Sequence, residues 1–209
     1  RAPTFRHAMA PSYKAHRKPP PDDLTRQRPL AKHAAIAMGL QSVALDGFEA
    51  DDLAATYTRL ALAAGADVTL VGADKDWQTL VQDPCVTFLN TMAHDDAERF
   101  LDEAAVKARF GVRPQLLGDL LALTGDASDG IEGIPGIGAV LGARLINHFG
   151  DLEAVLAEPG YGRSSLVGPK RASALVQYAD QARLARRLIQ LDDQVPVPLP
   201  LEVLGIYEP

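Results

Sequence analysis

The sequence predicts an α/β protein, with a parallel β-sheet flanked by helices in its first half and a helical module in its second half. Three observations predict this class. Strand-like and helix-like segments alternate up to about residue 100, which is typical of parallel sheets with crossover helices. Acidic residues follow a predicted strand or open a predicted helix, where ligands of parallel sheets bind. Beyond residue 101 the pattern is helical, with Gly-rich interruptions.

The first elements are two helices separated by a short strand. Residues 24–39 predict a helix that ends at Gly39, and residues 41–45 (QSVAL) predict a short strand. The segment DGFEADD then forms a turn into a second helix over residues 50–64, which Gly65 closes.

Two further strands follow in the first half. Residues 66–73 (ADVTLVGA) are rich in β-branched residues and predict a strand that delivers Asp74 and Asp76 at its carboxyl end. Residues 85–90 (CVTFLN) predict another. We therefore expect the carboxylates to gather at one edge of a parallel sheet.

The second half is predicted to be helical, with breaks at residues 111–114, 125–138 and 159–169. It ends near Asp192, because residues 195–203 (VPVPLPLEV) carry prolines at alternate positions and indicate an extended strand or tail.

Composition excludes several classes of protein. No apolar run approaches the roughly 20 residues that span a membrane, so we expect no membrane partner. The chain has a single cysteine, Cys85, which cannot form an internal disulfide and favours a reducing cytosol. The net charge is −6, yet residues 1–33 hold eight Lys and Arg against two Asp, or +6, so the remainder carries −12. This asymmetry suits a protein that grips a polyanion with one part, although a solvated basic tail has the same composition.

Three acidic groups indicate metal chemistry. They lie at the start of the 50–64 helix, after the 66–73 strand, and in the loop GDASDG. Each group alone also fits helix capping or turn formation. Together, carboxylates at one edge of a sheet repel one another, and Mg²⁺ or Mn²⁺ would relieve that repulsion. Two such ions can activate a water and stabilise the leaving oxygen of a phosphodiester, and the lack of paired His or Cys disfavours zinc.

The segment GIPGIG (133–138) precedes a predicted helix with small residues and resembles a helix-hairpin-helix. Its glycines would let backbone amides approach a phosphate without reading bases. An ordinary Gly-rich turn between helices is the alternative.

These residues resemble a known family, the 5′ nuclease domain of bacterial DNA polymerase I and its stand-alone relatives, the flap endonucleases and 5′–3′ exonucleases. The segments that carry the resemblance are TFRH (4–7), YKAHR (13–17), GFEADD (47–52), GADKD (72–76), LTGDASDG (123–130) and GIPGIG (133–138). The resemblance implies a PIN-like nuclease core with a helical arch at about residues 10–32, within residues 1–105. It implies a helix-three-turn-helix module that holds duplex DNA over residues 106–209.

The resemblance also implies roles for individual residues. The residues implied in the metal site are Glu49, Asp51, Asp52, Asp74, Asp76, Asp126 and Asp129. Lys14 and Arg17 would be catalytic, contacting the scissile phosphate, and Tyr13 would stack on a base. The residues implied in DNA binding are Arg6, Tyr13, Lys14, Arg17, Gly133, Gly136 and Gly138. A monovalent ion such as K⁺ would bind to hairpin carbonyls.

This chain departs from the family pattern in places. Family members carry two Asp residues before the segment that corresponds to APTFR, so we expect the metal site of these 209 residues to lack two carboxylates. Gly130 replaces an Asn, Val140 and Leu141 replace a Lys-Thr pair, and Trp77 replaces a Leu. We expect basic residues between 170 and 187 to compensate on the DNA side.

The expected function is therefore a two-metal 5′–3′ exonuclease or 5′-flap endonuclease of DNA replication and repair in the bacterial cytoplasm and nucleoid. The expected partner is DNA with a 5′ end or flap, with a polymerase domain as a further part of the parent protein and with the chain acting as a monomer. The alternatives are a catalytically impaired or inactive DNA-binding fragment and a PIN-like nuclease that acts on RNA.

Overall fold

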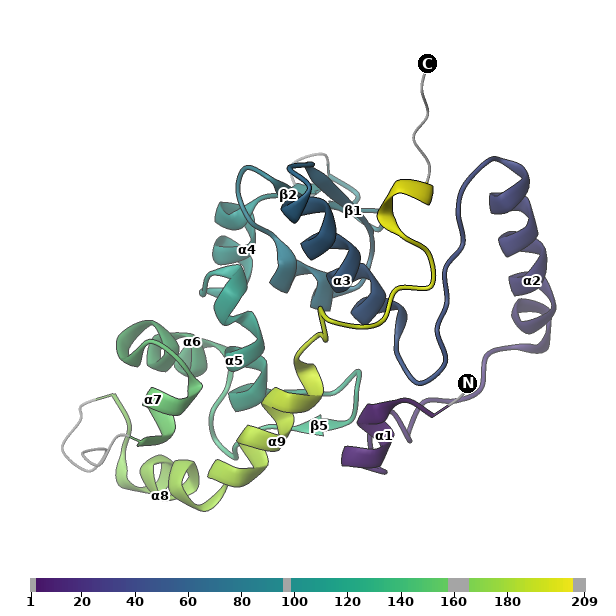
Figure 1. Cartoon of the computed structure of the whole chain (residues 1–209). Coiled ribbons are helices and arrows are strands. Elements are labelled where there is room, and N and C mark those ends of the chain that lie inside the picture. The colour runs from purple at the N-terminus through teal and green to yellow at the C-terminus, as the bar shows by residue number, and fades with distance from the viewer. Residues whose placement is uncertain (1–2, 96–98, 158–165, 205–209) are drawn as a thin grey trace.

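The computed structural model describes residues 3–95, 99–157 and 166–204 (Figure 1). The elements of the first half are α1 (Phe5–Met9), α2 (Asp22–Ala37), α3 (Ala50–Ala63), β1 (Val68–Gly72), the 3-10 helix η1 (Lys75–Leu80), β2 (Val86–Asn90) and β3 (Phe100–Leu101). The elements of the second half are α4 (Glu103–Phe110), α5 (Pro114–Thr124), β4 (Gly125–Asp126), β5 (Ile131–Glu132), α6 (Ala139–Phe149), α7 (Leu152–Ala157), α8 (Pro169–Gln177), α9 (Ala179–Ile189) and the 3-10 helix η3 (Leu201–Val203).

A small sheet with the strand order β1-β2-β3 forms the centre of the first half. β1 and β2 are parallel, with Leu70 opposite Phe88, and η1 lies in the crossover between them. β3 pairs antiparallel to β2. Leu70, Phe88 and Leu101 point into one hydrophobic cluster, to which α4 adds Val106. The predicted parallel sheet with flanking helices is confirmed.

The strand predicted at residues 41–45 is wrong. This segment has no regular structure, and most of its residues are exposed. Among the described residues no strand pairs with it, and a β-prone sequence without a pairing partner gains neither ladder hydrogen bonds nor packing.

The arch region stands away from the body. α2 has no buried residue, and Figure 1 shows it separated from the sheet by two long connections. Only its base, residues 10–17, contacts the acidic loops, through bonds such as that from the Lys14 amide to the Asp129 carbonyl oxygen (2.8 Å).

The second half is built around α5. Leu117, Leu120 and Leu123 of this helix are buried in the larger hydrophobic cluster, where α6 and α9 pack against them. α6 approaches closely because Gly142 has no side chain: a Cβ there would lie 2.8 Å from Leu120 Cδ1. The predicted helical module is confirmed.

The chain then returns to the first half. After α9 it runs along α3, where the Tyr57 hydroxyl donates to the Leu199 carbonyl oxygen (2.8 Å) and Arg59 Nε donates to the Asp193 carbonyl oxygen (2.8 Å). Residues 195–200 form an irregular tail rather than a strand, since their alternate prolines cannot donate to a ladder, and residues 201–203 form η3.

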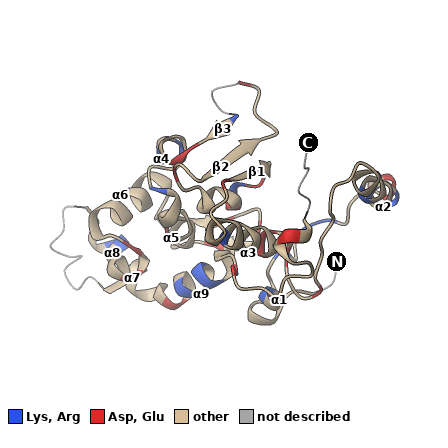
Figure 2. Ribbon diagram, turned by 45° about the horizontal axis from the view of Figure 1, so that its top comes forward, with Lys and Arg blue, Asp and Glu red and all other residues tan. Residues whose placement is uncertain are grey.

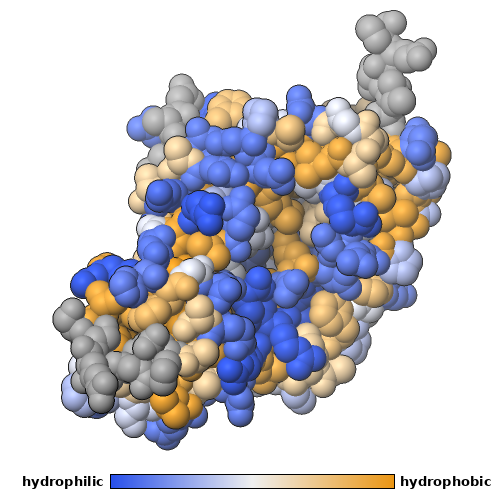
Figure 3. All heavy atoms as spheres, turned by 60° about the vertical axis from the view of Figure 1, so that its left-hand side comes forward, coloured by the Kyte–Doolittle hydropathy of each residue, from blue (hydrophilic) through white to orange (hydrophobic). Residues whose placement is uncertain are grey.

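The surface is mixed in character. On the face drawn in Figure 3, bands of hydrophilic side chains separate smaller apolar patches. None of the helices in the part of the chain that the structure describes is both long and apolar enough to cross a membrane.

Candidate active site

Three carboxylates from two distant segments meet beside the end of β1. Asp76 comes from η1, and Asp126 and Asp129 come from β4 and the loop that follows it. One carboxylate oxygen from each residue lies within 4.8 Å of those of the other two, a spacing that could hold a metal ion. We refer to these three residues as the acidic cluster. The structure thus brings together two of the three acidic groups found in the sequence.

Asp76 has the least satisfied side chain of the cluster. Its Oδ1 is buried and has no hydrogen-bond partner. The pKa of this carboxyl is raised to about 6, mainly by burial and also by the charges of Asp74, Asp129 and Asp126, against the opposing effect of Lys75. A buried carboxylate oxygen without a donor fits a hard cation, because Mg²⁺ and similar ions prefer oxygen ligands.

Asp126 is held by its own loop and by a lysine. Its Oδ1 accepts hydrogen bonds from the Ser128 amide (3.0 Å) and the Ser128 hydroxyl (2.7 Å). Its Oδ2 accepts one from Lys75 Nζ (2.6 Å). Burial raises the pKa of Asp126, but these bonds outweigh that effect and leave the pKa below its usual range. Sequence reasoning overlooked Lys75, whose position between two Asp residues in the segment DKD was the available signal.

The base of the arch supplies cations to the same site. Lys14 Nζ donates to both oxygens of Glu49 (2.9 and 3.0 Å) and lies 3.4 Å from Asp129 Oδ2. Arg17 donates from its terminal NH₂ group to Asp129 Oδ1 (2.6 Å) and from Nε to the Ser128 carbonyl oxygen (3.0 Å). Lys14 adopts a left-handed backbone conformation with φ of 54°. The basic pair therefore lies directly over the carboxylates.

Tyr13 does not lie where base stacking requires it. Its side chain is buried, 2% exposed, and its hydroxyl donates to Glu49 Oε2 (2.9 Å) and Asp129 Oδ2 (3.0 Å). The ring packs into the larger hydrophobic cluster and is not exposed for the base stacking that the resemblance implies. Burial, together with the charges of Asp129 and Glu49, raises the pKa of Tyr13, so its hydroxyl stays protonated as a donor.

Arg6, expected at the DNA interface, and Asp52, expected in the metal site, form a buried ion pair with each other. Arg6 is 1% exposed and donates through both terminal nitrogens to Asp52 (2.7 Å each), so its guanidinium is enclosed by protein. The two oxygens of Asp52 also accept the amides of Glu49 and Asp192 (3.0 Å each). Asp52 therefore joins the ion pair rather than the acidic cluster. Its pKa is lowered because these bonds outweigh the effect of burial.

Asp51 and Asp74 lie beside the acidic cluster rather than within it. Asp51 accepts a hydrogen bond from Trp77 Nε1 (2.8 Å), so this tryptophan does more than pack. Burial raises the pKa of Asp51, and the charge of Asp74 contributes. Asp74 is exposed and accepts the Asp76 amide (3.1 Å), which fixes the start of η1.

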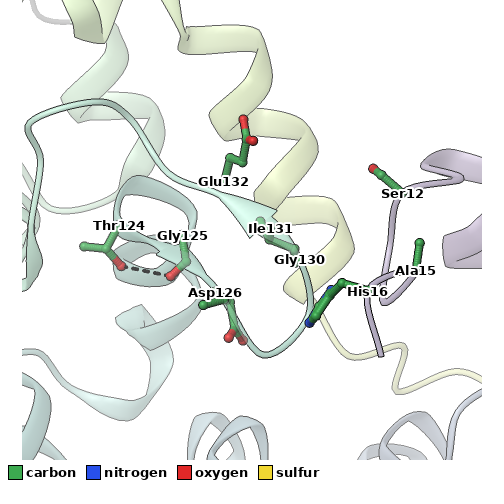
Figure 4. A pocket seen from close by; sticks show the side chains of 10 residues that line it. Ser12, Ala15, His16, Thr124, Gly125, Asp126, Gly130, Ile131 and Glu132 are labelled. Carbon is green, nitrogen blue, oxygen red and sulfur yellow. Dashed lines mark hydrogen bonds between the residues drawn. The ribbon is translucent and has the colours of Figure 1, made fainter. Parts of the chain in front are cut away.

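A pocket of about 660 Å³ opens beside the cluster, between the arch base and the β4–β5 loop. Figure 4 shows Ser12, Ala15 and His16 on one side of it, with Asp126 and Gly130 on the other. Gly130 has φ of +70°, and a Cβ there would lie 2.9 Å from His16 Nδ1. Glycine at this position thus allows the arch base to close on the acidic loop.

The three hairpin glycines are not equivalent. Gly133 lies against α5, where a Cβ would be 2.2 Å from the Thr124 carbonyl carbon. Gly136 has φ of +82°, is exposed, and its carbonyl oxygen accepts Arg171 Nε (3.1 Å). Gly138 is the exposed N-cap residue of α6, with open space around it. Only Gly136 and Gly138 are thus placed for a phosphate to approach their backbone.

Some of the basic residues of α8 and α9 that were expected to compensate for Val140 and Leu141 in DNA binding are already paired with carboxylates. Figure 2 shows Lys and Arg along α9. Arg183 pairs with Glu153 and Asp180, and Arg186 pairs with Asp119 of α5. The compensation expected from these two arginines is therefore opposed by carboxylates that already hold them.

Comparison with known proteins places the whole chain in one family. The N-terminal resolvase-like domain of 5′-3′ exonucleases matches residues 1–111, and the C-terminal SAM-fold domain of the same enzymes matches residues 112–209. DNA polymerase I of Rhizobium leguminosarum is 39% identical over 208 residues, which are 100% of this chain and 20% of that protein. The flap endonuclease Xni of Cronobacter sakazakii is 34% identical over 207 residues, which are 99% of this chain and 78% of that protein.

A solved structure shares the fold. T5 5′-exonuclease with bound divalent zinc ions has a TM-score of 0.74 and 25% identity, with 91% of this chain and 71% of that chain covered. The chain thus spans a fifth of the polymerase relative and most of the length of the smaller relatives.

Proposed function

Because this chain belongs to the 5′-3′ exonuclease family, we propose that it is a metal-dependent 5′ nuclease that hydrolyses phosphodiester bonds in DNA near 5′ ends and flaps. The observation that carries the proposal is the acidic cluster, in which Asp76 Oδ1 is buried without a hydrogen bond, with Lys14 and Arg17 at its edge. Carboxylates that hold cations beside a basic pair are suited to a phosphodiester rather than to a neutral substrate.

The residues present fit a hard divalent cation. Asp76, Asp126 and Asp129 would hold it, and Glu49 and Asp51 extend the negative charge on one side. We propose Mg²⁺ or Mn²⁺ because every available ligand is a carboxylate oxygen. Such an ion, when bound, lowers the pKa of a water and polarises the phosphodiester. A preference for zinc is disfavoured, because no His or Cys lies in the acidic cluster.

The chain's own side chains perform the remaining tasks. Lys14 and Arg17 place positive charge where the scissile phosphate approaches the cluster, and this charge stabilises the developing negative charge of the transition state. The Tyr13 hydroxyl bridges Glu49 and Asp129, because it lies within hydrogen-bonding distance of one oxygen of each. The pocket between the arch base and the β4–β5 loop would receive the strand next to the cleaved bond.

The hairpin would anchor duplex DNA away from the cleavage point. The exposed backbone at Gly136 and Gly138 precedes α6, and the positive end of this helix dipole favours a phosphate. The exposed Val140 gives no charge there, so we expect weak anchoring.

The decisive test is single-turnover cleavage of a 5′-labelled DNA flap by the 209-residue chain, with Mg²⁺, with Mn²⁺ and with EDTA. We expect metal-dependent cutting near the flap junction and no cutting in EDTA. Tight binding without cutting would support a non-catalytic DNA-binding role instead. Equal or faster cutting of a matched RNA flap would contradict the DNA preference.

A further inference from the structure

Lys75 is placed where a bound cation would be expected. Its Nζ lies 2.6 Å from Asp126 Oδ2, 3.0 Å from Ser128 Oγ and 3.6 Å from Asp76 Oδ1. Two of these three partners belong to the acidic cluster. The ammonium thus sits between Asp76 and Asp126, the two carboxylates that arrive from different halves of the chain.

The site contains more negative charge than its own cations balance. The carboxylates around it are Glu49, Asp51, Asp52, Asp74, Asp76, Asp126 and Asp129. The basic side chains paired with them are Arg6, Lys14, Arg17 and Lys75. Arg6 is buried beside Asp52, whereas the side chain of Lys75 is 30% exposed and can withdraw into solvent.

A divalent ion and this ammonium compete for the same oxygen. Asp126 Oδ1 is already occupied by two hydrogen bonds from Ser128, so Oδ2 is the oxygen left for a metal. Metal–oxygen bonds of about 2.0–2.6 Å would place the ion within the contact distance of the ammonium. Two cations that close repel each other strongly in a half-buried site.

We propose that Lys75 is a resident counter-ion of the metal centre, which balances Asp126 and Asp76 in the metal-free protein and must withdraw before a divalent ion binds. Lys75 acts through the carboxylates, so it is a positioning residue that sets metal affinity. The inference rests on the proposed metal-dependent function. Competition by Lys75 raises the free metal concentration that is needed to occupy the site.

The proposal predicts the direction of change on removing the lysine charge. If Lys75 merely supported the site, the protein without its charge would bind the metal more weakly. If Lys75 is a competing counter-ion, the variant protein binds the metal more tightly. The metal then no longer has to displace the ammonium, and the repulsion between Asp76 and Asp126 is greater in the metal-free state.

The test is a calorimetric titration of the full chain with Mn²⁺ in the absence of DNA. The variants are Lys75→Met, which removes the charge and the hydrogen bonds, and Lys75→Gln, which removes the charge but keeps a shorter hydrogen-bond donor. Lys107→Met is the matched control, because Lys107 is an exposed lysine on α4 and lies outside the metal site. We expect both Lys75 variants to bind Mn²⁺ about tenfold more tightly or better, and the control to match the wild type.

A second readout is the rise in Tm that saturating Mn²⁺ produces. We expect a larger rise for the Lys75 variants, with a lower Tm in EDTA. Equal or weaker Mn²⁺ binding by both variants would overturn the role of Lys75 while leaving the proposed function intact. Absence of Mn²⁺ binding in the wild type would contradict the proposed function. If only the Lys75 variants bound Mn²⁺, the result would still support competition by Lys75. If neither the wild type nor the variants bound Mn²⁺, both the proposed function and the role of Lys75 would be overturned.

Discussion

At the scale of single residues, Asp76 has a buried oxygen that accepts no hydrogen bond and lies among other carboxylates. In the metal-free protein this costs stability, because Oδ1 of the ionised form has neither solvent nor a hydrogen-bond donor, and Lys75 Nζ comes no closer than 3.6 Å. The same feature makes Asp76 available to a metal ion. Function and stability therefore oppose each other at this residue.

We predict that Asp76→Asn abolishes metal-dependent cleavage but stabilises the metal-free fold. Because the folded-state pKa is raised to about 6, the native state binds more protons than the unfolded state between about pH 3.8 and pH 6. The contribution of Asp76 to stability is thus present below pH 3.8 and is lost as the pH rises through about 6. The gain on neutralising it should be about 1–3 kcal/mol at pH 7 and near zero at pH 4.

Urea unfolding in EDTA at the two pH values measures this difference. The matched control is Asp67→Asn, because Asp67 is an exposed aspartate directly before β1. A gain that is the same at pH 4 and pH 7 would show that charge repulsion is not its cause. Retained cleavage in the variant would remove Asp76 from the metal site.

Lys14 is held by Glu49 and Asp129 before any substrate arrives. We predict that Lys14→Ala slows single-turnover cleavage by about 10²–10³-fold at saturating DNA, because its charge acts on the transition state more than on the bound substrate. Cleavage time courses at several DNA concentrations measure the limiting rate. Lys107→Ala serves as the control, and a limiting rate equal to that of the wild type would exclude Lys14 from the chemistry.

At the scale of elements, the hairpin before α6 contains two glycines with different roles: Gly133 is needed for packing, and Gly138 is open to a ligand. Gly133 touches the α5 backbone, while Gly138 has open space around it at the N-cap of α6. We predict that Gly133→Ala lowers the free energy of unfolding by more than about 3 kcal/mol, because a Cβ there meets backbone atoms that cannot rotate away.

Gly138→Ala is the contrasting change in the same hairpin. We expect it to cost about 1 kcal/mol or less in stability but to weaken binding to duplex DNA several-fold, since the methyl group stands between the helix amides and a phosphate. Chemical denaturation and fluorescence anisotropy with a labelled duplex measure the two effects. Unchanged DNA affinity in a folded Gly138→Ala protein would remove the hairpin from the DNA interface.

At the scale of the whole molecule, Arg6 joins three distant segments. Besides its pair with Asp52 at the start of α3, it donates from Nε to the Leu188 carbonyl oxygen (2.8 Å) and from a terminal nitrogen to the Gln190 carbonyl oxygen (2.7 Å) at the end of α9. The N-terminal segment, the sheet half and the helical half therefore share one buried guanidinium. Removing the Arg6 guanidinium should therefore destabilise both halves of the protein together.

We predict that Arg6→Met destabilises the protein by about 3–5 kcal/mol, because Asp52 is left charged and buried without its partner. Adding Asp52→Asn should recover part of that loss. The control Arg183→Met removes an exposed arginine that pairs with Glu153 and Asp180, and we expect little change. Urea unfolding curves test this, and a loss no larger than that of the control would contradict the buried-pair account.

Local sequence predicted the helices over residues 24–39 and 50–64, the helix after GIPGIG, the helical character of the second half and both parallel strands, because apolar spacing and end signals are local properties. It failed at residues 41–45, where strand formation needs a partner that the described structure does not bring close. The acidic groups were found from residue type and position alone. Which of these residues lie together was not predicted. Asp126 and Asp129 form a cluster with Asp76, whereas Asp52 forms an ion pair with Arg6.

The sequence by itself determined the fold class, the family and the set of ionisable groups around the site, since these depend on residue order and composition. Only the tertiary structure decided which cation faces which carboxylate. Arg6 and Tyr13 became buried donors and Lys75 entered the acidic cluster because charges distant in sequence are paired only when folding removes them from water. Pairing of this kind depends on three-dimensional proximity, on which single-chain patterns carry no information.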